Sequence, residues 1–344
     1  MTKTNNKLDH LVSARGIAAW LVVLLHSMAM MPASTPEAAI KVIMHGYLAV
    51  DFFFVLSGFI IFINYYTKFD ENFREKVFTF YWNRFSRIYP LHLLMLLAYL
   101  MLALAFTHFS TSGKPPASYT SQAFLESVFL VQGWSGNPTA WNVPSWSISA
   151  EWFVYLLFPF MTIAMRKWVG KLGTHLFLCA SLLLAIYLIY AALGIDSLGK
   201  SVASMALVRA FVEFSLGTLI GSLFIHHRPL LMQSKILLVG SIASIAVAYI
   251  FLNAHDYVIA PLSFFLLVAY LSVDDSFVSK LLSNKALVYL GEISYSTYMV
   301  HYFVYDLFKA GWVKYAHIPN PVHLYASFIV VLLLSMLTHK FVEV

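Results

Sequence analysis

Four ionisable side chains lie inside long hydrophobic runs of this sequence, and these residues are the first candidates for chemistry: His26, Asp51, Glu151 and His301. A charged group in such a run is costly, so it needs a partner or a function. Each lies about five or six residues from one end of its run, about 7–9 Å along a helix. One bundle would therefore gather all four in a polar layer, where a neutral imidazole is a candidate proton acceptor. Two structural carboxylate–imidazole pairs would give the same layer without chemistry, and this alternative stays open.

Basic residues form a second group. Arg84 and Arg87 lie three residues apart in the segment Arg84–Phe85–Ser86–Arg87–Ile88–Tyr89–Pro90. They share one face if the segment is helical and flank one turn if it is extended, and either arrangement can clamp a phosphate by charge-assisted hydrogen bonds. Anchoring to lipid headgroups is the alternative. Arg15 precedes His26 by eleven residues, so on a helix both would face the same way, about 16 Å apart.

The elements that must position these residues are membrane-spanning helices. Of the 344 residues, 60% are apolar and 11% are charged, whereas about a quarter of a soluble domain is charged. The sequence predicts an all-α polytopic integral membrane bundle of about ten transmembrane helices, in a single domain of residues 1–344. The hydrophobic runs fall at about 10–31, 46–65, 90–109, 146–165, 174–193, 201–225, 235–252, 257–273, 286–307 and 323–342.

The basic residues also orient the bundle. Sixteen of the 22 Lys and Arg lie on the same side as the N-terminus and five on the opposite side, so both termini are predicted to be cytoplasmic. Arg209, inside a run, is interpreted as a neutralised buried pair with Glu213. The inner connection, 67–89, has the charges and aromatic residues of a helix lying in the interface. The long outer connection, 110–145, is predicted to be a partly re-entrant extracytoplasmic loop.

Five sequence blocks follow one another in a defined order. They are Leu8–Asp9–His10 through Arg15–Gly16–Ile17–Ala18–Ala19 to His26, then Asp51–Phe59, Arg84–Pro90, Trp146–Tyr155 and Gly291–His301. Together they resemble the motifs of the membrane-bound acyltransferase-3 family, whose polytopic members acylate polysaccharides and other extracytoplasmic acceptors. Two departures are Ala49, where members often have Gly, and the end at Val344, where members commonly continue with a basic residue and Pro.

The resemblance implies a stand-alone O-acyltransferase of the bacterial cytoplasmic (inner) membrane, surrounded by membrane lipids. The acyl group, expected to be acetyl, would pass from cytoplasmic acyl-CoA to a hydroxyl of an extracytoplasmic polysaccharide, lipid-linked sugar or glycolipid. Arg15, Arg84 and Arg87 would bind the phosphates of acetyl-CoA or another acyl-CoA. Neither a nucleic acid partner nor a metal is expected, since no His-Glu-x-x-His motif occurs. The alternative is a polytopic transporter of a small polar or acylated substrate, although no inverted repeat is detectable.

Acyl transfer to an alcohol needs a base for the hydroxyl proton and a donor for the developing oxyanion. His26 is the candidate base, and Glu151 or Asp51 would hold its tautomer, as the acidic member of a catalytic triad does. A direct transfer and an acyl-His or acyl-Ser intermediate are both open. The candidate substrate-binding or oxyanion-binding residues are Ser147, Ser149, Tyr155, Tyr295, Tyr298 and His301.

Overall fold

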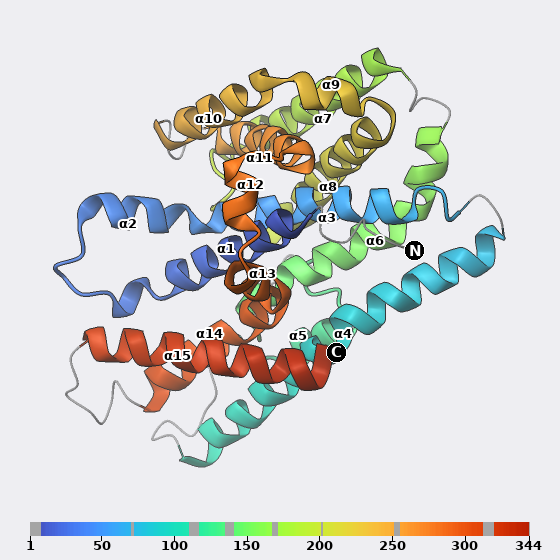
Figure 1. The fold of residues 1–344 in the computed structure, drawn as a ribbon. Coiled ribbons are helices and arrows are strands. Elements are labelled where there is room, and N and C mark those ends of the chain that lie inside the picture. Colours follow the sequence, from blue (N-terminus) through green and yellow to red (C-terminus); the bar gives the residue numbers. More distant parts are fainter. Residues whose placement is uncertain are drawn as a thin grey trace.

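The computed structural model describes residues 8–69, 72–109, 117–134, 141–166, 171–200, 202–250, 255–311 and 320–343. Within these ranges every regular element is a helix (Figure 1). This confirms the predicted all-α polytopic membrane bundle, while the number of spans and the orientation of the termini stay predictions. In the described part of the chain, seven helical segments are long and apolar enough to cross a membrane: Glu37–Tyr65, Phe73–His108, Val143–Met165, Leu172–Ala192, Ser204–His226, Asp256–Val273 and Val322–Glu343.

Within the described residues, each predicted hydrophobic run contains one α-helix, except the run 286–307, which contains two. The helices are α1 Asp9–His26, α2 Glu37–Met44, α3 Ala49–Tyr65, α4 Phe73–Phe109, α5 Ser121–Val128, α6 Trp146–Arg166, α7 Leu172–Ala192, α8 Val202–His226, α9 Arg228–Gln233, α10 Lys235–Ile250, α11 Asp256–Val273, α12 Phe277–Leu282, α13 Lys285–Glu292, α14 Ser294–Gly311 and α15 Asn320–Thr338. In Figure 1, α7, α9, α10 and α11 form the upper part of the view and α4, α14 and α15 the lower part, with α1, α3 and α6 between them.

Two predicted boundaries are wrong. The segment 67–89 does not form a separate interfacial helix, because α4 continues without a break for 37 residues and contains Pro90. At 1.5 Å per residue this helix is about 55 Å long, so it extends well beyond a hydrocarbon core of about 30 Å. The run 286–307 is divided, since α13 ends at Glu292 and α14 begins at Ser294.

Of the predicted loop 110–145, residues 110–116 and 135–140 lie outside the described ranges. The helix α5 lies in the described part and packs against α4. The hydroxyl of Tyr89 donates to the carbonyl oxygen of Val128 at 3.1 Å. The imidazole Nε2 of His92 lies 2.8 Å from the carbonyl oxygen of Ser127. These two contacts join the loop to the middle of α4, within the Arg84–Pro90 segment and directly after it. The re-entrant character of the loop stays a prediction.

The helices α3 and α8 approach each other closely because glycines face each other across their contact. A Cβ atom on Gly217 would lie 2.0 Å from the carbonyl oxygen of Val55, and one on Gly58 would lie 2.1 Å from that of Phe214. Small residues at such contacts let helix backbones approach and gain van der Waals contact in a membrane. The position of α3 matters for the site, since α3 carries both Asp51 and Ser57.

Replacing Gly217 by Ala is expected to destabilise the protein by about 1–3 kcal/mol, because the methyl group has to push α3 and α8 apart. The measurement is thermal unfolding of the purified protein in detergent. Gly173→Ala is the matched control, since a Cβ there meets nothing within 4 Å. That helical substitution should be neutral or slightly stabilising. Equal melting temperatures for Gly217→Ala and Gly173→Ala would contradict the close packing.

Candidate functional site

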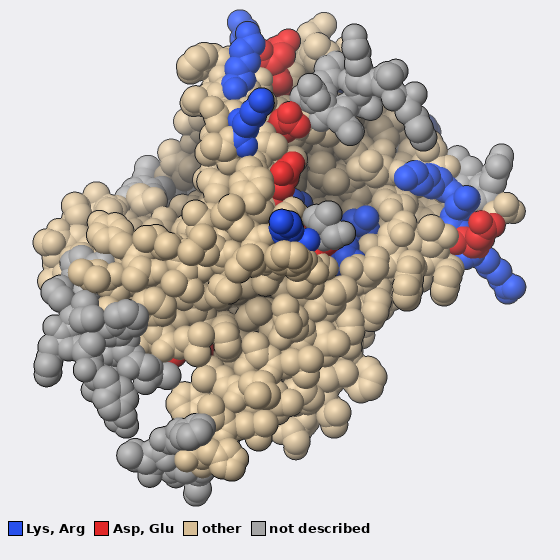
Figure 2. All heavy atoms as spheres, turned by 60° about the horizontal axis from the view of Figure 1, so that its bottom comes forward, with Lys and Arg blue, Asp and Glu red and all other residues tan. Residues whose placement is uncertain are grey.

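A cavity of about 230 Å³ lies among α1, α3, α4, α6 and the start of α14. Its charged lining residues are Arg15, Arg84, Arg87 and Glu151, and most of the remaining wall is aliphatic or aromatic. In the orientation of Figure 2, basic and acidic side chains gather around a hollow in the molecular surface, and uncharged residues cover most of the rest of that face. A cavity with three cations and one carboxylate is suited to an anion that also carries an apolar part.

The arginines keep hydrogen-bond donors available for a ligand. One terminal nitrogen of Arg15 donates to the carbonyl oxygen of Gly291 at 2.8 Å. The Nε atoms of Arg15 and Arg84 are buried and have no hydrogen-bond partner among the described residues. The Arg84 guanidinium also lies 5.5 Å from the centre of the Tyr65 ring. Since Arg84 and Arg87 are both within α4, their spacing puts them on one helical face. Buried donors without partners are costly, and an anion in the cavity would satisfy them.

Glu151 faces the same cavity from α6. Its Oε1 accepts a hydrogen bond from the Ser57 hydroxyl at 2.6 Å and another from the Tyr155 hydroxyl. Both hydroxyl groups belong to residues that line the cavity. The carboxylate is therefore held by two neutral donors from α3 and α6, and it lies in the compartment that contains the arginines.

Tyr298 and Ser147 line another part of the wall. Their hydroxyl oxygens lie 2.8 Å apart, and the Tyr298 hydroxyl donates to the carbonyl oxygen of Pro144 at 3.0 Å. The ring of Tyr298 packs against Phe53 on one side, with 5.9 Å between ring centroids, and against His301 on another, at 6.0 Å. Tyr298 thus connects the cavity to a histidine pair that is not part of the lining.

That pair consists of His26 at the end of α1 and His301 in α14. Nδ1 of His26 lies 3.1 Å from Nε2 of His301, and the ring centroids are 5.1 Å apart. His301 is fully buried, whereas His26 is half-buried. The two imidazoles predicted for one layer are therefore in direct contact, and a molecule outside the bundle could reach His26 more readily than His301.

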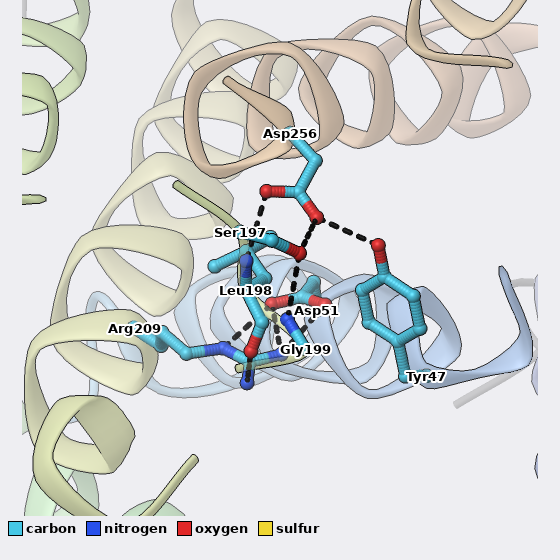
Figure 3. A network of polar contacts seen from close by, with 7 residues as sticks. All are labelled: Tyr47, Asp51, Ser197, Leu198, Gly199, Arg209 and Asp256. Atoms are coloured by element: carbon cyan, nitrogen blue, oxygen red, sulfur yellow. Dashed lines mark hydrogen bonds and ion pairs between the residues drawn. The ribbon is translucent and has the colours of Figure 1, made fainter. Parts of the chain in front are cut away.

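Asp51 belongs to a third group, which Figure 3 shows from close by. Both of its carboxylate oxygens accept hydrogen bonds from Arg209, at 2.8 and 2.9 Å from the same terminal nitrogen. Both side chains are at most 1% exposed. The hydrogen-bonded partner of Arg209 is Asp51 of α3 and not the predicted Glu213 of its own helix, although Glu213 is buried close enough to interact electrostatically with Arg209. The two oxygens of Glu213 are buried and have no hydrogen-bond partner among the described residues.

The same network fixes the connection before α8. Arg209 donates to the carbonyl oxygen of Leu198 at 3.0 Å. Asp256, at the start of α11, accepts hydrogen bonds from the hydroxyls of Tyr47 and Ser197, at 2.7 and 2.8 Å, and from the Leu198 backbone N–H at 2.8 Å (Figure 3). These contacts tie α3, α8, α11 and the connecting segment together beside Asp51. Their geometry is that of a structural ion-pair network.

Comparison with known proteins agrees with this arrangement. A family model described as "Acyltransferase domain" matches residues 9–340, nearly the whole chain. The chain belongs to the acyltransferase-3 family. The acyltransferase MdmB of Streptomyces mycarofaciens is 27% identical over 279 residues, which cover 75% of this chain and 68% of that relative. No solved structure matches the chain.

In this acyltransferase, most of the predicted site residues share the cavity, although their roles stay predictions. Tyr295 is one of them, and its hydroxyl donates to the carbonyl oxygen of Ile88 at 2.6 Å. Ser149 is elsewhere, because its hydroxyl donates to the carbonyl oxygen of Leu130 at 2.7 Å and accepts from the Gly133 N–H at 3.1 Å. The predicted residues that line the cavity are Arg15, Arg84, Arg87, Ser147, Glu151, Tyr155, Tyr295 and Tyr298.

Sequence reasoning missed two members of these groups. Ser57 holds the Glu151 carboxylate, and a hydroxyl six residues after Asp51 in an otherwise apolar run was the available signal. The second is Arg209 as the partner of Asp51. Its i,i+4 spacing from Glu213 favoured the local pair, and nothing in one sequence indicates which of two carboxylates a buried arginine contacts.

Proposed function

We propose that this acyltransferase moves an acyl group, with acetyl as the expected group, from cytoplasmic acyl-CoA to a hydroxyl of a glycan or glycolipid on the other side of the bacterial cytoplasmic membrane. The observation that carries this proposal is the cavity in which Arg15, Arg84 and Arg87 meet an apolar wall. Coenzyme A combines phosphates with a long, weakly polar arm. Guanidinium groups bind phosphate oxygens through two parallel hydrogen bonds, and two of these arginines have an unused Nε donor.

The proposed direction of transfer follows from the positions of the two groups along α1. Arg15 lies in the first half of α1 and His26 is its last residue, so about 16 Å of helix separates them. The extended arm of coenzyme A spans roughly this distance. Phosphates at the arginines would therefore bring the thioester toward the histidines. The excess of Lys and Arg on the side of the N-terminus supports a cytoplasmic position for the phosphate end.

The proposed chemistry is a direct transfer. Nε2 of His26 takes the proton of the acceptor hydroxyl, and the oxygen of that hydroxyl attacks the carbonyl carbon of the thioester. The carbon–sulfur bond then breaks, and coenzyme A leaves as a thiolate that receives the proton from the imidazolium. The hydroxyls of Tyr298 and Ser147 in the cavity wall are the proposed donors to the carbonyl oxygen in the transition state. To donate there, their hydrogens turn away from the Pro144 carbonyl oxygen and from each other. The products are the acyl ester and the free thiol of coenzyme A.

Mass spectrometry of surface glycans tests the proposal most directly. Cells that produce the protein should carry glycans heavier by one acyl group than cells that lack it. The mass difference identifies the acyl group, and the fragment that carries the extra mass identifies the sugar. The purified protein in lipid vesicles, with acetyl-CoA and these glycans, should release coenzyme A thiol. Unchanged glycan masses, together with no thiol release, would reject the proposal.

Replacing Arg87 by Ala is expected to raise the KM for acyl-CoA by about tenfold to hundredfold with little change in kcat, because one charge-assisted phosphate contact is lost from both ground and transition states. Coenzyme A release, measured against donor concentration, separates the two parameters. Arg74→Ala is the matched control, since Arg74 is an exposed cation on α4 that does not line the cavity. Equal KM values for the two variants would exclude Arg87 from donor binding.

A further inference from the structure

The contacts of His301 fix which of its nitrogens carries a hydrogen. Nδ1 lies 2.7 Å from the carbonyl oxygen of Tyr298 and 3.2 Å from that of Thr297. Carbonyl oxygens only accept hydrogen bonds, so Nδ1 is the N–H nitrogen. A neutral imidazole has one N–H group, which makes Nε2 of His301 an acceptor. This nitrogen is the one that faces His26.

The contacts of His26 lead to a matching assignment. Its Nδ1 lies 3.1 Å from the carbonyl oxygen of Val22 and 3.1 Å from Nε2 of His301. Both of these partners are acceptors, so Nδ1 of His26 carries the hydrogen. Its Nε2 then has a free lone pair, and the described residues form no hydrogen bond to it. The opposite tautomer would leave Nδ1 of His26 without a hydrogen against two acceptors, which no neutral arrangement of the pair can satisfy.

We propose that His301 is a positioning residue that holds His26 in the Nδ1–H tautomer and so leaves Nε2 as the base for the acceptor hydroxyl. This inference rests on the proposed function and deepens it. When His26 takes the proton at Nε2, its Nδ1–H group donates to the lone pair of His301, which stabilises the imidazolium. A second imidazole thus has the role that an acidic side chain has in a Ser-His-Asp triad.

The surroundings of the pair are suited to this role. His301 is 0% exposed, and its ring lies between Tyr298 and Tyr305, each with a centroid 6.0 Å away. Packing on both sides fixes the orientation of the ring and of its acceptor nitrogen. The two carboxylates expected to orient His26 are engaged elsewhere: Asp51 with Arg209, and Glu151 with Ser57 and Tyr155. Among the described residues, His301 is the side chain in hydrogen-bonding contact with the His26 ring, which also contacts the backbone carbonyl oxygen of Val22.

Two substitutions of His301 separate positioning from packing. His301→Phe keeps a ring but removes the acceptor, so kcat should fall about 100-fold, with the KM for acyl-CoA unchanged. His301→Gln has a side-chain carbonyl oxygen near the position of Nε2, which can accept from His26, so kcat should return to within about tenfold of wild type. If His301 acted only through packing, His301→Gln would not restore kcat. The melting temperature in detergent is measured for every variant.

His175→Phe is the matched control. His175 is also buried, and its Nε2 lies 2.7 Å from the Ser222 hydroxyl, but it belongs to α7 and is outside the site. Its substitution should leave kcat unchanged even if the melting temperature falls. A His301→Phe variant with wild-type kcat, or a His301→Gln variant as inactive as His301→Phe, overturns the role of His301 alone. A wild-type protein without acyl transfer overturns both this inference and the proposed function.

Discussion

His26→Ala is expected to reduce kcat for acyl transfer by about 10³-fold or more, the largest catalytic effect expected of any single substitution in this chain. Without the imidazole the proposed base is lost, and His301 does not replace it, because its ring is 0% exposed and is held in place through the hydrogen bond of its Nδ1–H to a backbone carbonyl. His26 does not line the arginine cavity, so the KM for acyl-CoA should stay near its wild-type value. Release of coenzyme A thiol in lipid vesicles measures both parameters.

A histidine close to the same end of α1 provides the control. His45 follows α2 and packs beside Tyr47, with ring centroids 6.0 Å apart. His45→Ala should retain full activity and the same melting temperature. Near-normal turnover by His26→Ala, with normal insertion into the membrane, would remove His26 from the mechanism. The base would then have to be sought in the cavity, where Glu151 is the available carboxylate.

The fold was predictable to the level of the helices because a bilayer imposes one length scale on the sequence. Every predicted run contains a helix, but the ends of the helices were less predictable. Pro90 suggested the start of a new span, since proline removes a backbone donor and clashes with the preceding turn. In the structure it lies inside α4. Transmembrane helices tolerate proline where neighbouring groups satisfy the freed backbone carbonyl, and such neighbours are tertiary information.

The break in the run 286–307 has a similar origin. The helix α13 ends at Glu292, immediately after Gly291, where a Cβ atom would lie 1.9 Å from the carbonyl oxygen of Val12. Gly291 therefore lets α13 approach α1, and its own carbonyl oxygen accepts the hydrogen bond from Arg15. A glycine in a hydrophobic run indicates a close approach of some kind. The partner helix cannot be read from one sequence.

For the candidate site, the sequence predicted the types of the ionisable residues and their depth in the bundle. It did not predict which side chains contact one another. An ionisable residue in a hydrophobic run indicates a functional site or an ion pair, and its position along the helix gives its depth. Depth along the helices predicted one layer for His26 and His301, which are in contact in the structure, but it did not favour this pair over a pair of carboxylate and imidazole. It could not separate Asp51 from Glu151, because the two carboxylates have similar depths but lie on different helices. The rotation of each helix about its axis determines these contacts: Asp51 forms an ion pair with Arg209, and Glu151 lines the cavity that contains the arginines.

Asp51→Ala is expected to lower the free energy of unfolding by about 3–5 kcal/mol, the largest effect on stability expected of a single substitution here. Removal of the Asp51 carboxylate takes away the hydrogen-bonded counter-ion of the buried Arg209 guanidinium, with Glu213 as the remaining carboxyl group near it. Breaking a buried pair from one side has a cost of this size. The side chains are 0% and 1% exposed, so water cannot replace the lost oxygens. Thermal unfolding in detergent and the yield of folded protein measure the effect.

The double variant Asp51→Ala/Arg209→Met separates this structural role from the catalytic role predicted for Asp51. An apolar side chain in place of the guanidinium removes the unpaired cation, although the carboxyl group of Glu213 stays buried beside it. Stability should therefore return in part, and acyl transfer should return with it, since His301 and not Asp51 contacts His26. A double variant that is stable but inactive would show that the Asp51 carboxylate acts in catalysis. A single variant with wild-type stability would contradict the ion pair itself.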